Sequence, residues 1–227
     1  MNVLVIGASR GIGLELVRQY LEDGDRVIAT ARDTEGLERL RRLDALALKL
    51  DVAQPTSVSG LSWLLDGETL DVALYVAGVY APQDAKAPPT QQAFDAMMHT
   101  NVLGAMQVIP QVAPLVEAAR GKFAFLSSEM GQVGGATASL GWVYRTSKAA
   151  LNMVVVAAQG DYPGAQFLLL HPGWVQTDMG SAQAPLAVNE SVSALRATLA
   201  GAHRPDRALV PKDVPFLHWD GRPFPSW

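Results

Sequence analysis

Apolar and polar positions follow two patterns that alternate along the chain. Short continuous apolar runs are typical of strands buried on both faces, and they predict strands at 2–6, 26–30, 45–50, 71–77, 122–127, 165–171 and 215–219. Between these runs, apolar residues recur with a helical period, as Ile12, Leu16 and Tyr20 do. This period predicts helices near 12–23, 34–42, 56–66, 91–118, 143–158 and 189–201, with the long one interrupted near Pro110 and Pro114.

Regular alternation of strand and helix predicts a doubly wound α/β fold, in which helices cover both faces of a parallel sheet. The sequence contains no linker, no low-complexity segment and no internal repeat. A length of 227 residues suits one α/β domain with a full core, so we expect a single domain over 1–227.

Composition removes several classes of function. The net charge of −4 gives no reason to expect nucleic-acid binding, and the absence of cysteine excludes disulfides and thiolate metal sites. The four histidines are scattered, so we expect no metal site. No apolar run is long enough to span a membrane, and no basic region with a cleavage site precedes the first strand. We therefore expect a soluble, cytoplasmic protein without a membrane partner.

A glycine-rich turn, "GASRGIG" at 7–13, joins the first predicted strand to the first predicted helix. Such a turn exposes backbone N–H groups at a helix N-terminus, and the missing side chains let a phosphate approach the backbone. The spacing is Gly7-x-x-x-Gly11-x-Gly13 rather than G-x-G-x-x-G. The alternative is a tight strand–helix turn that binds nothing.

A second group of polar residues lies at the same edge of the predicted sheet. Tyr144 and Lys148 are four residues apart at the start of a helix, so their side chains share one face. The lysine charge is expected to lower the pKa of the phenol, which could then transfer a proton at physiological pH. Ser127 and Ser128 end the fifth strand, and ligands of open α/β sheets bind at such carboxyl ends.

Taken together, these motifs resemble the short-chain dehydrogenase/reductase family, which has a Rossmann-type fold. The resemblance covers nearly the whole chain and includes "DV" at 51–52, "AG" at 77–78, "NVLG" at 101–104, "YRTSK" at 144–148 and "HPGWVQTD" at 171–178. Within the family the sequence is most similar to the C-factor/sniffer-type carbonyl reductases. The wide spacing from Ser128 to Tyr144 and the closing "DGRPFPSW" are the features that point there.

The resemblance implies a catalytic set. Tyr144 would be the general acid in carbonyl reduction, or the base in alcohol oxidation, and Lys148 would hold the nicotinamide ribose. Ser128 would orient the substrate oxygen, with Ser127 as a structural neighbour. Asn101 would support a water and proton relay to Lys148, although taken singly it could instead satisfy a helix kink.

It also implies a cofactor site. Asp51 would contact the adenine with Val52 packed on it, and Thr177 would hold the carboxamide. Singly, Asp51 could be a helix cap and Thr177 a turn residue. The implied cofactor residues are Gly7, Ser9, Arg10, Gly11, Ile12, Gly13, Arg32, Asp51, Val52, Ala77, Gly78, Tyr144, Lys148, Pro172, Gly173, Val175 and Thr177. The sequence departs from the family at Tyr75-Val76, where two asparagines are usual, so we expect altered bracing of the sheet and a changed cofactor affinity.

The second predicted strand indicates which nicotinamide cofactor is preferred. Ala31 stands where a carboxylate would select NAD, and Arg32 follows it. Arg10 adds a second guanidinium, and two arginines without an acid suit the 2′-phosphate, so NADP(H) is favoured over NAD(H). Asp33 is expected to cap the helix at 34–42. The alternative is that both arginines are solvated surface residues.

The substrate is predicted to be a small apolar or aromatic carbonyl or alcohol compound: a ketone, an aldehyde or a quinone. Its expected pocket residues are Met130, Val133, Trp142, Trp174 and Met179. His171 is expected to be a hydrogen-bonded structural residue.

The helix at 144–158 is apolar on more than one face, so we expect a homodimer or homotetramer formed through helices around 91–118 and 144–158. The alternative function is an NADP-binding regulator or signalling protein without turnover, which would not need the Ser–Tyr–Lys set.

Overall fold

A computed structural model describes all 227 residues, and its strands form one seven-stranded sheet in which every pairing is parallel. The strand order is β3-β2-β1-β4-β5-β6-β7, so the chain changes direction across the sheet between β1 and β4. The strands are β1 (Asn2–Ile6), β2 (Arg26–Ala31), β3 (Leu46–Lys49), β4 (Val72–Tyr75), β5 (Lys122–Leu126), β6 (Gln166–His171) and β7 (Phe216–His218). The predicted parallel sheet is confirmed, with strand ends within a few residues of those expected.

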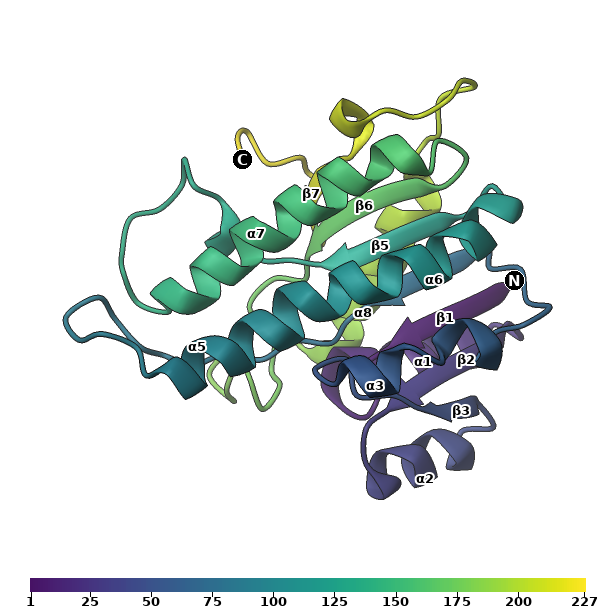
Figure 1. Cartoon of the computed structure of the whole chain (residues 1–227), viewed down its shortest axis with the longest axis horizontal. Coiled ribbons are helices and arrows are strands. Elements are labelled where there is room, and N and C mark those ends of the chain that lie inside the picture. Colours follow the sequence, from purple (N-terminus) through teal and green to yellow (C-terminus); the bar gives the residue numbers. More distant parts are fainter.

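Successive strand residues point to opposite sides of the sheet, so its apolar strands present apolar side chains on both faces. Helices cover both faces and bury these side chains. One core contains Val3 and Val5 of β1 and is closed by α1 (Gly11–Glu22), α2 (Thr34–Arg42) and α8 (Val188–Gly201). The other contains Leu4 and Ile6 and is closed mainly by α6 (Gly104–Ala118) and α7 (Trp142–Ala158). Figure 1 shows α6 and α7 side by side in front of the sheet, with α5 (Gln91–Met98) leading into α6. This is the doubly wound Rossmann-type arrangement.

Two predicted helices differ from the structure. The helix expected near 56–66 consists of two single turns, α3 (Pro55–Val58) and α4 (Leu61–Leu64). The interruption expected at Pro110 and Pro114 was wrong, because α6 runs through both prolines. Both are exposed, so the opposite face of α6 keeps its packing against the sheet and holds the helix together. The irregular stretch is instead a π-helical turn at His99–Leu103.

The carboxyl ends of the parallel strands all lie at one edge of the sheet. The glycine turn follows β1, residues 76–79 follow β4 and Ser127 follows β5, so the topology gathers the predicted site residues from segments far apart in sequence. No helix combines the length and the apolar composition that crossing a membrane requires.

Candidate functional site

The glycine turn is built so tightly that side chains are excluded from it. A Cβ atom placed on Gly13 would overlap the Gly7 carbonyl oxygen, and one placed on Gly7 would lie 2.6 Å from the amide nitrogen of Ala77. Gly7 also has a φ of +87°, a conformation that favours glycine. The turn therefore packs α1 directly against β1 and leaves the N-terminus of α1 open.

That open end forms part of a cavity of about 620 Å³ at the carboxyl edge of the sheet. The size suits a small-molecule ligand. Nearly all of the cofactor residues implied by the sequence line it: Gly7, Ser9, Arg10, Gly11, Ile12, Gly13, Arg32, Asp51, Val52, Ala77, Gly78, Tyr144, Lys148, Pro172 and Thr177.

Two implied cofactor residues, Gly173 and Val175, do not line the cavity. Gly173 has a φ of +83° and packs so closely that an added Cβ would lie 2.9 Å from Leu186 and 3.0 Å from Trp219. Val175 is buried and forms an isolated bridge with Leu186. Both residues therefore pack against Leu186 and hold the segment after β6 in place.

Asp51, Val52 and Thr177 line the cavity, and two of them also shape local turns. An oxygen of the Asp51 carboxylate accepts a hydrogen bond from the Ala53 amide at 3.0 Å. The Thr177 hydroxyl accepts one from the Gly180 amide, also at 3.0 Å. The turn role that the sequence left open for Thr177 is thus present, whereas Asp51 shapes a turn before α3 (Pro55–Val58) and does not cap a helix, since no side chain caps α3.

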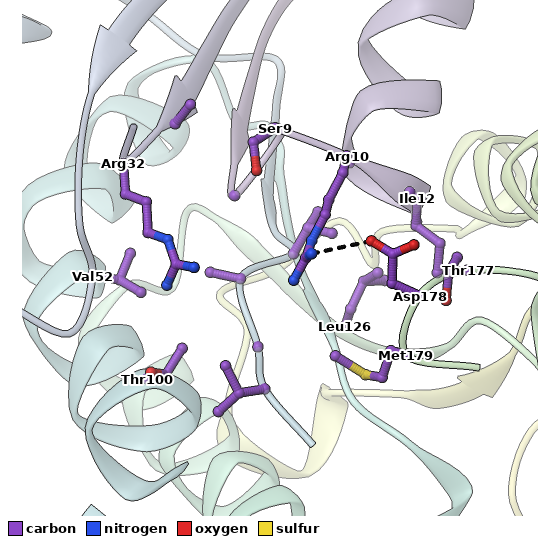
Figure 2. Close-up of a pocket in the computed structure, with 18 of the residues that line it drawn as sticks. Ser9, Arg10, Ile12, Arg32, Val52, Thr100, Leu126, Thr177, Asp178 and Met179 are labelled. Atoms are coloured by element: carbon purple, nitrogen blue, oxygen red, sulfur yellow. Dashed lines mark hydrogen bonds and ion pairs between the residues drawn. The ribbon is translucent and has the colours of Figure 1, made fainter. Parts of the chain in front are cut away.

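Arginine side chains gather at the end of the cavity next to β2. Figure 2 shows Arg32 and Arg10 reaching into the cavity from opposite sides, and Arg10 Nη1 lies 3.0 Å from a carboxylate oxygen of Asp178. Both guanidinium-bearing side chains are 66% exposed, so both are accessible to an anionic ligand. Ala31, buried at the end of β2, offers no carboxylate there.

Sequence reasoning missed a third arginine. Arg39 of α2 lines the cavity, and its Nε donates a hydrogen bond to the Ser9 carbonyl at 3.0 Å. This contact arises because α2 packs onto the glycine turn: a Cβ on Gly36 would lie 2.7 Å from the Ser9 Cβ. Helical period alone could not reveal it, since the position depends on how α2 crosses the turn. The acidic residues Asp33, Glu35 and Asp178 also line this end.

Tyr144 and Lys148 are both buried and face the other end of the cavity. Lys148 Nζ lies 5.6 Å from the centre of the Tyr144 ring and donates a hydrogen bond to the Leu126 carbonyl at 2.7 Å. The rings of Tyr80 and Tyr144 pack perpendicular to one another with centroids 5.1 Å apart. The predicted juxtaposition of phenol and ammonium is therefore present.

The predicted fall in the pKa of Tyr144, by contrast, is not found. Burial raises the pKa of this phenol to about 12, with Ser128 acting in the opposite direction and Tyr80 adding to the rise. Burial also lowers the pKa of Lys148 to about 8. The expectation failed because it weighed the charge of Lys148 alone, whereas removal of both groups from water favours their neutral forms.

The two serines after β5 have different surroundings. Ser128 is buried, and its hydroxyl accepts a hydrogen bond from the Met130 amide at 3.1 Å at the start of a 3₁₀ turn. Ser127 lines the cavity, and its hydroxyl donates to the Asn152 side-chain oxygen at 2.5 Å. Ser128 itself does not line the cavity in this structure, although it acts on the Tyr144 phenol.

Asn101 lies in the π-helical turn and is fully buried. Its side-chain oxygen accepts from the Val79 amide at 2.8 Å, while its side-chain nitrogen donates to the Val79 carbonyl at 3.0 Å and to the Ser147 hydroxyl at 2.9 Å. A Cβ on Gly78 would lie 3.4 Å from the Asn101 oxygen and 3.6 Å from Lys148 Nζ, so Asn101 and Lys148 flank the same glycine.

The predicted substrate residues are only partly brought together. Met179 lines the cavity, and Met130 and Trp142 pack in the small cluster around Tyr144. Val133 and Trp174 do not line the cavity and are 73% and 54% exposed. The loop that carries Val133 is tied to the chain end instead, because the Gly134 amide donates to the Trp227 carbonyl at 3.0 Å.

His171 is buried, as a structural residue should be, but its predicted hydrogen bonding is wrong. Its Nδ1 atom has no hydrogen-bond partner, and the ring packs edge-on against His218 and Phe224. Burial lowers the pKa of His171 to about 4, so the ring is neutral at physiological pH.

Comparisons with known proteins agree with this arrangement. The profile of a family described as short chain dehydrogenase matches residues 1–185. A 1-hydroxy-2-glutathionyl-2-methyl-3-butene dehydrogenase from Rhodococcus sp. (strain AD45) is 33% identical over 182 residues, which are 78% of this chain and 79% of that protein. A short-chain dehydrogenase/reductase from Burkholderia multivorans with bound NADP superposes with a TM-score of 0.87 at 29% identity, covering 100% of this chain and 99% of that one. The carbonyl reductase Sniffer of D. melanogaster gives a TM-score of 0.85 at 26% identity, with the same coverage.

Proposed function

This chain belongs to the short-chain dehydrogenase family, and on that premise we propose that it is an oxidoreductase that uses NADP(H) to reduce a small carbonyl compound or to oxidise the corresponding alcohol. All 227 residues would serve as one NADP(H)-binding domain. The observation that carries the proposal is one continuous cavity with arginines and an open helix N-terminus at one end and Tyr144 with Lys148 at the other.

The residues of the cavity fit a dinucleotide phosphate. Side chains at Gly7 and Gly13 would collide with the backbone, so the turn stays open for a diphosphate group. Arg10 and Arg32 are accessible to a further phosphate, and β2 ends on Ala31 without a carboxylate, although the Asp33 carboxylate that caps α2 lies beside Arg32. The NADP bound to the Burkholderia neighbour supports the same preference. NADPH, when bound, supplies the hydride.

The remaining chemistry concerns a proton. The raised pKa of Tyr144 keeps its phenol protonated at neutral pH, so it can donate a proton to a carbonyl oxygen as that oxygen gains charge. Lys148 would hold the ribose and, as a cation, stabilise the phenolate left behind. Ser128 would orient the carbonyl oxygen, and Asn101 would support a water and proton relay to Lys148. The apolar cluster around Tyr144 favours an apolar or aromatic substrate.

The test is the variant Tyr144→Phe, which removes only the proton donor. NADPH oxidation is followed by absorbance across a panel of aldehydes, ketones and quinones, and NADPH affinity is measured separately. We expect turnover to fall by at least about 100-fold while the NADPH Kd changes by less than about twofold, since the hydroxyl contributes little to cofactor binding. Tyr162→Phe makes the same chemical change on a residue that stacks on Phe167, outside the cavity, and serves as the control.

Retention of most of the wild-type kcat by Tyr144→Phe would refute the assigned mechanism. If the wild type binds NADPH tightly but reduces none of these compounds, the alternative of an NADP-binding regulator is favoured instead.

A further inference from the structure

Tyr75 stands where the family usually has an asparagine, and its side chain is fully buried at the end of β4. The ring packs against Phe125 with centroids 6.0 Å apart. The phenol is not left unpaired, because Oη donates a hydrogen bond to the Thr100 carbonyl at 2.8 Å. Tyr75 therefore joins the centre of the sheet to the π-helical turn at His99–Leu103.

The geometry of that turn explains why the Thr100 carbonyl is available. In an α-helix, the Gly104 amide would donate to the carbonyl four residues earlier, which is that of Thr100. In this chain it donates to the His99 carbonyl, five residues earlier. The Tyr75 hydroxyl supplies a donor to the carbonyl that this shift deprives of its helical partner.

Gly104 makes room for this contact. A Cβ at position 104 would lie 2.6 Å from Tyr75 Oη and 2.8 Å from the Val52 carbonyl oxygen. The phenol thus occupies the space that a side chain would need at the first position of α6. The wide turn, the glycine and the buried hydroxyl fit together as one unit.

This unit is connected to the candidate active site by short polar contacts. Thr100 lines the cavity, and the next residue is Asn101, which donates to the Ser147 hydroxyl at 2.9 Å. Ser147 in turn donates to the Tyr144 carbonyl at 2.7 Å, in the first turns of α7. A displacement of the π-helical turn would therefore move Asn101 and loosen the backbone that carries Tyr144.

We propose that Tyr75 is a positioning residue for the reaction: its hydroxyl holds the His99–Leu103 turn in π-helical form and so sets the place of Asn101 between Val79 and Ser147. This inference rests on the proposed function for its effect on catalysis, but its effect on the turn does not depend on any activity.

The experiment uses Tyr75→Phe, which keeps the ring in the core and removes only the hydroxyl. We expect kcat for carbonyl reduction to fall by about fivefold to tenfold, the loss equivalent to one hydrogen bond, while the NADPH Kd changes by less than about twofold. Hydrogen exchange of the Val79 amide, which donates to Asn101, should accelerate by a similar factor, about fivefold to tenfold, because local opening becomes easier.

Two comparisons separate positioning from general stability. Tyr20→Phe also deletes a buried phenol hydroxyl, but on the opposite face of the sheet, and it should change neither kcat nor Val79 exchange. In an Asn101→Ala background, Tyr75→Phe should cost less than about twofold in kcat, since residues that act as one unit are not additive.

Unchanged kcat and unchanged Val79 exchange in Tyr75→Phe would overturn the inference. It would also be overturned if Tyr75→Phe lowered kcat by the full fivefold to tenfold in the Asn101→Ala background, or if Tyr20→Phe lowered kcat as much as Tyr75→Phe does. If Tyr144→Phe is inactive while Tyr75→Phe keeps full activity, this inference fails and the proposed function stands. If the wild type reduces no carbonyl compound, Val79 exchange alone decides: faster exchange supports the inference and unchanged exchange overturns it.

Discussion

At the scale of single residues, burial is the cause of the unusual pKa of Lys148. The ammonium group is enclosed and its hydrogen bond to the Leu126 carbonyl replaces only part of its hydration. Burial consequently lowers the pKa from 10.5 to about 8, and the folded protein holds the protonated form at a cost. A residue placed in this way serves the site at the expense of stability.

We predict that Lys148→Met is more stable than the wild type at pH 7, by up to about 3 kcal/mol. Between pH 8 and 10.5 the unfolded chain binds more protons at this residue than the folded chain does, so wild-type stability rises with pH there. The advantage of the variant should shrink over that window and vanish above it. Denaturant unfolding from pH 7 to 10.5 measures this.

The matched control is Lys86→Met, which removes an exposed lysine and should leave the free energy of unfolding nearly constant relative to wild type. A Lys148→Met variant less stable than wild type at pH 7 would show that the hydrogen bond to Leu126 outweighs the cost of burial.

The arginines at the other end of the cavity should select the cofactor. Removing Arg10 or Arg32 should weaken NADPH binding by about tenfold and leave NADH nearly unchanged, because a charge-assisted contact to the 2′-phosphate contributes about 1.5 kcal/mol at an exposed position. Titration of both cofactors against each variant, at low and moderate salt, measures the effect, which should decrease with salt.

Arg41→Ala is the control for those titrations, since Arg41 is exposed on α2 and does not line the cavity. Equal losses for NADPH and NADH would assign the arginines to the diphosphate or to the fold. A wild type that binds NADH more tightly would exclude the NADP(H) preference altogether.

At the scale of elements, α2 is placed by its cap and by its close contact with the glycine turn. The Asp33 carboxylate accepts a hydrogen bond from the Gly36 amide at 2.7 Å, which confirms the predicted cap. The same carboxylate lines the cavity beside Arg32, where it would repel a phosphate. One residue thus stabilises the helix and opposes the proposed ligand.

Replacing Asp33 by serine separates those two effects. Asp33→Ser keeps a capping oxygen, so stability should stay within about 0.5 kcal/mol of wild type, whereas Asp33→Ala should lose about 1 kcal/mol. Both variants remove the negative charge and should bind NADPH about threefold more tightly, with little change for NADH. Thermal unfolding and cofactor titration measure the two effects. Weaker NADPH binding in Asp33→Ser would indicate that the carboxylate contacts the cofactor favourably.

At the scale of the whole molecule, the outer surfaces of α6 and α7 carry no charged side chain at their centre. Met106, Pro110 and Pro114 are exposed on α6, and Met153 and Ala157 are exposed on the neighbouring α7. The two helices lie side by side on one side of the molecule (Figure 1). An apolar surface of this kind is typical of an interface, so the predicted homodimer or homotetramer stays our proposal.

Sedimentation equilibrium at micromolar concentration should therefore give at least twice the mass of one chain. The double variant Met106→Lys, Met153→Lys should sediment as a monomer, because two buried lysines oppose association across a symmetric interface. Leu46→Lys changes an apolar residue that is 46% exposed on the edge strand β3, whose main contacts are with β2 and α2, and should leave the mass unaltered. A monomeric wild type would refute the proposal.

The sequence by itself determined the fold and most of the candidate cavity. Buried strands such as 2–6 and 166–171 contain continuous apolar runs, at 3–6 and 167–170, and this pattern does not depend on where the strands lie in the sheet. Because carboxyl ends of parallel strands meet at one edge, the glycine turn and Ser127 could be placed together from the sequence alone, whereas Ala77 was placed there by its resemblance to the family motif. The pairing of Tyr144 with Lys148 followed from helical spacing alone.

Only the tertiary structure decided features that depend on contacts between distant segments. The irregular turn lies at His99–Leu103 and not at the prolines, because the Tyr75 hydroxyl and Gly104 meet there across 25 and more residues of chain. Arg39 reaches the glycine turn only through the crossing of α2 over Ser9. Whether the pKa of Tyr144 is raised or lowered likewise depends on how many atoms from several elements exclude water from the phenol. Local spacing specifies which side chains share a helix face, but desolvation and close packing are sums over the folded molecule.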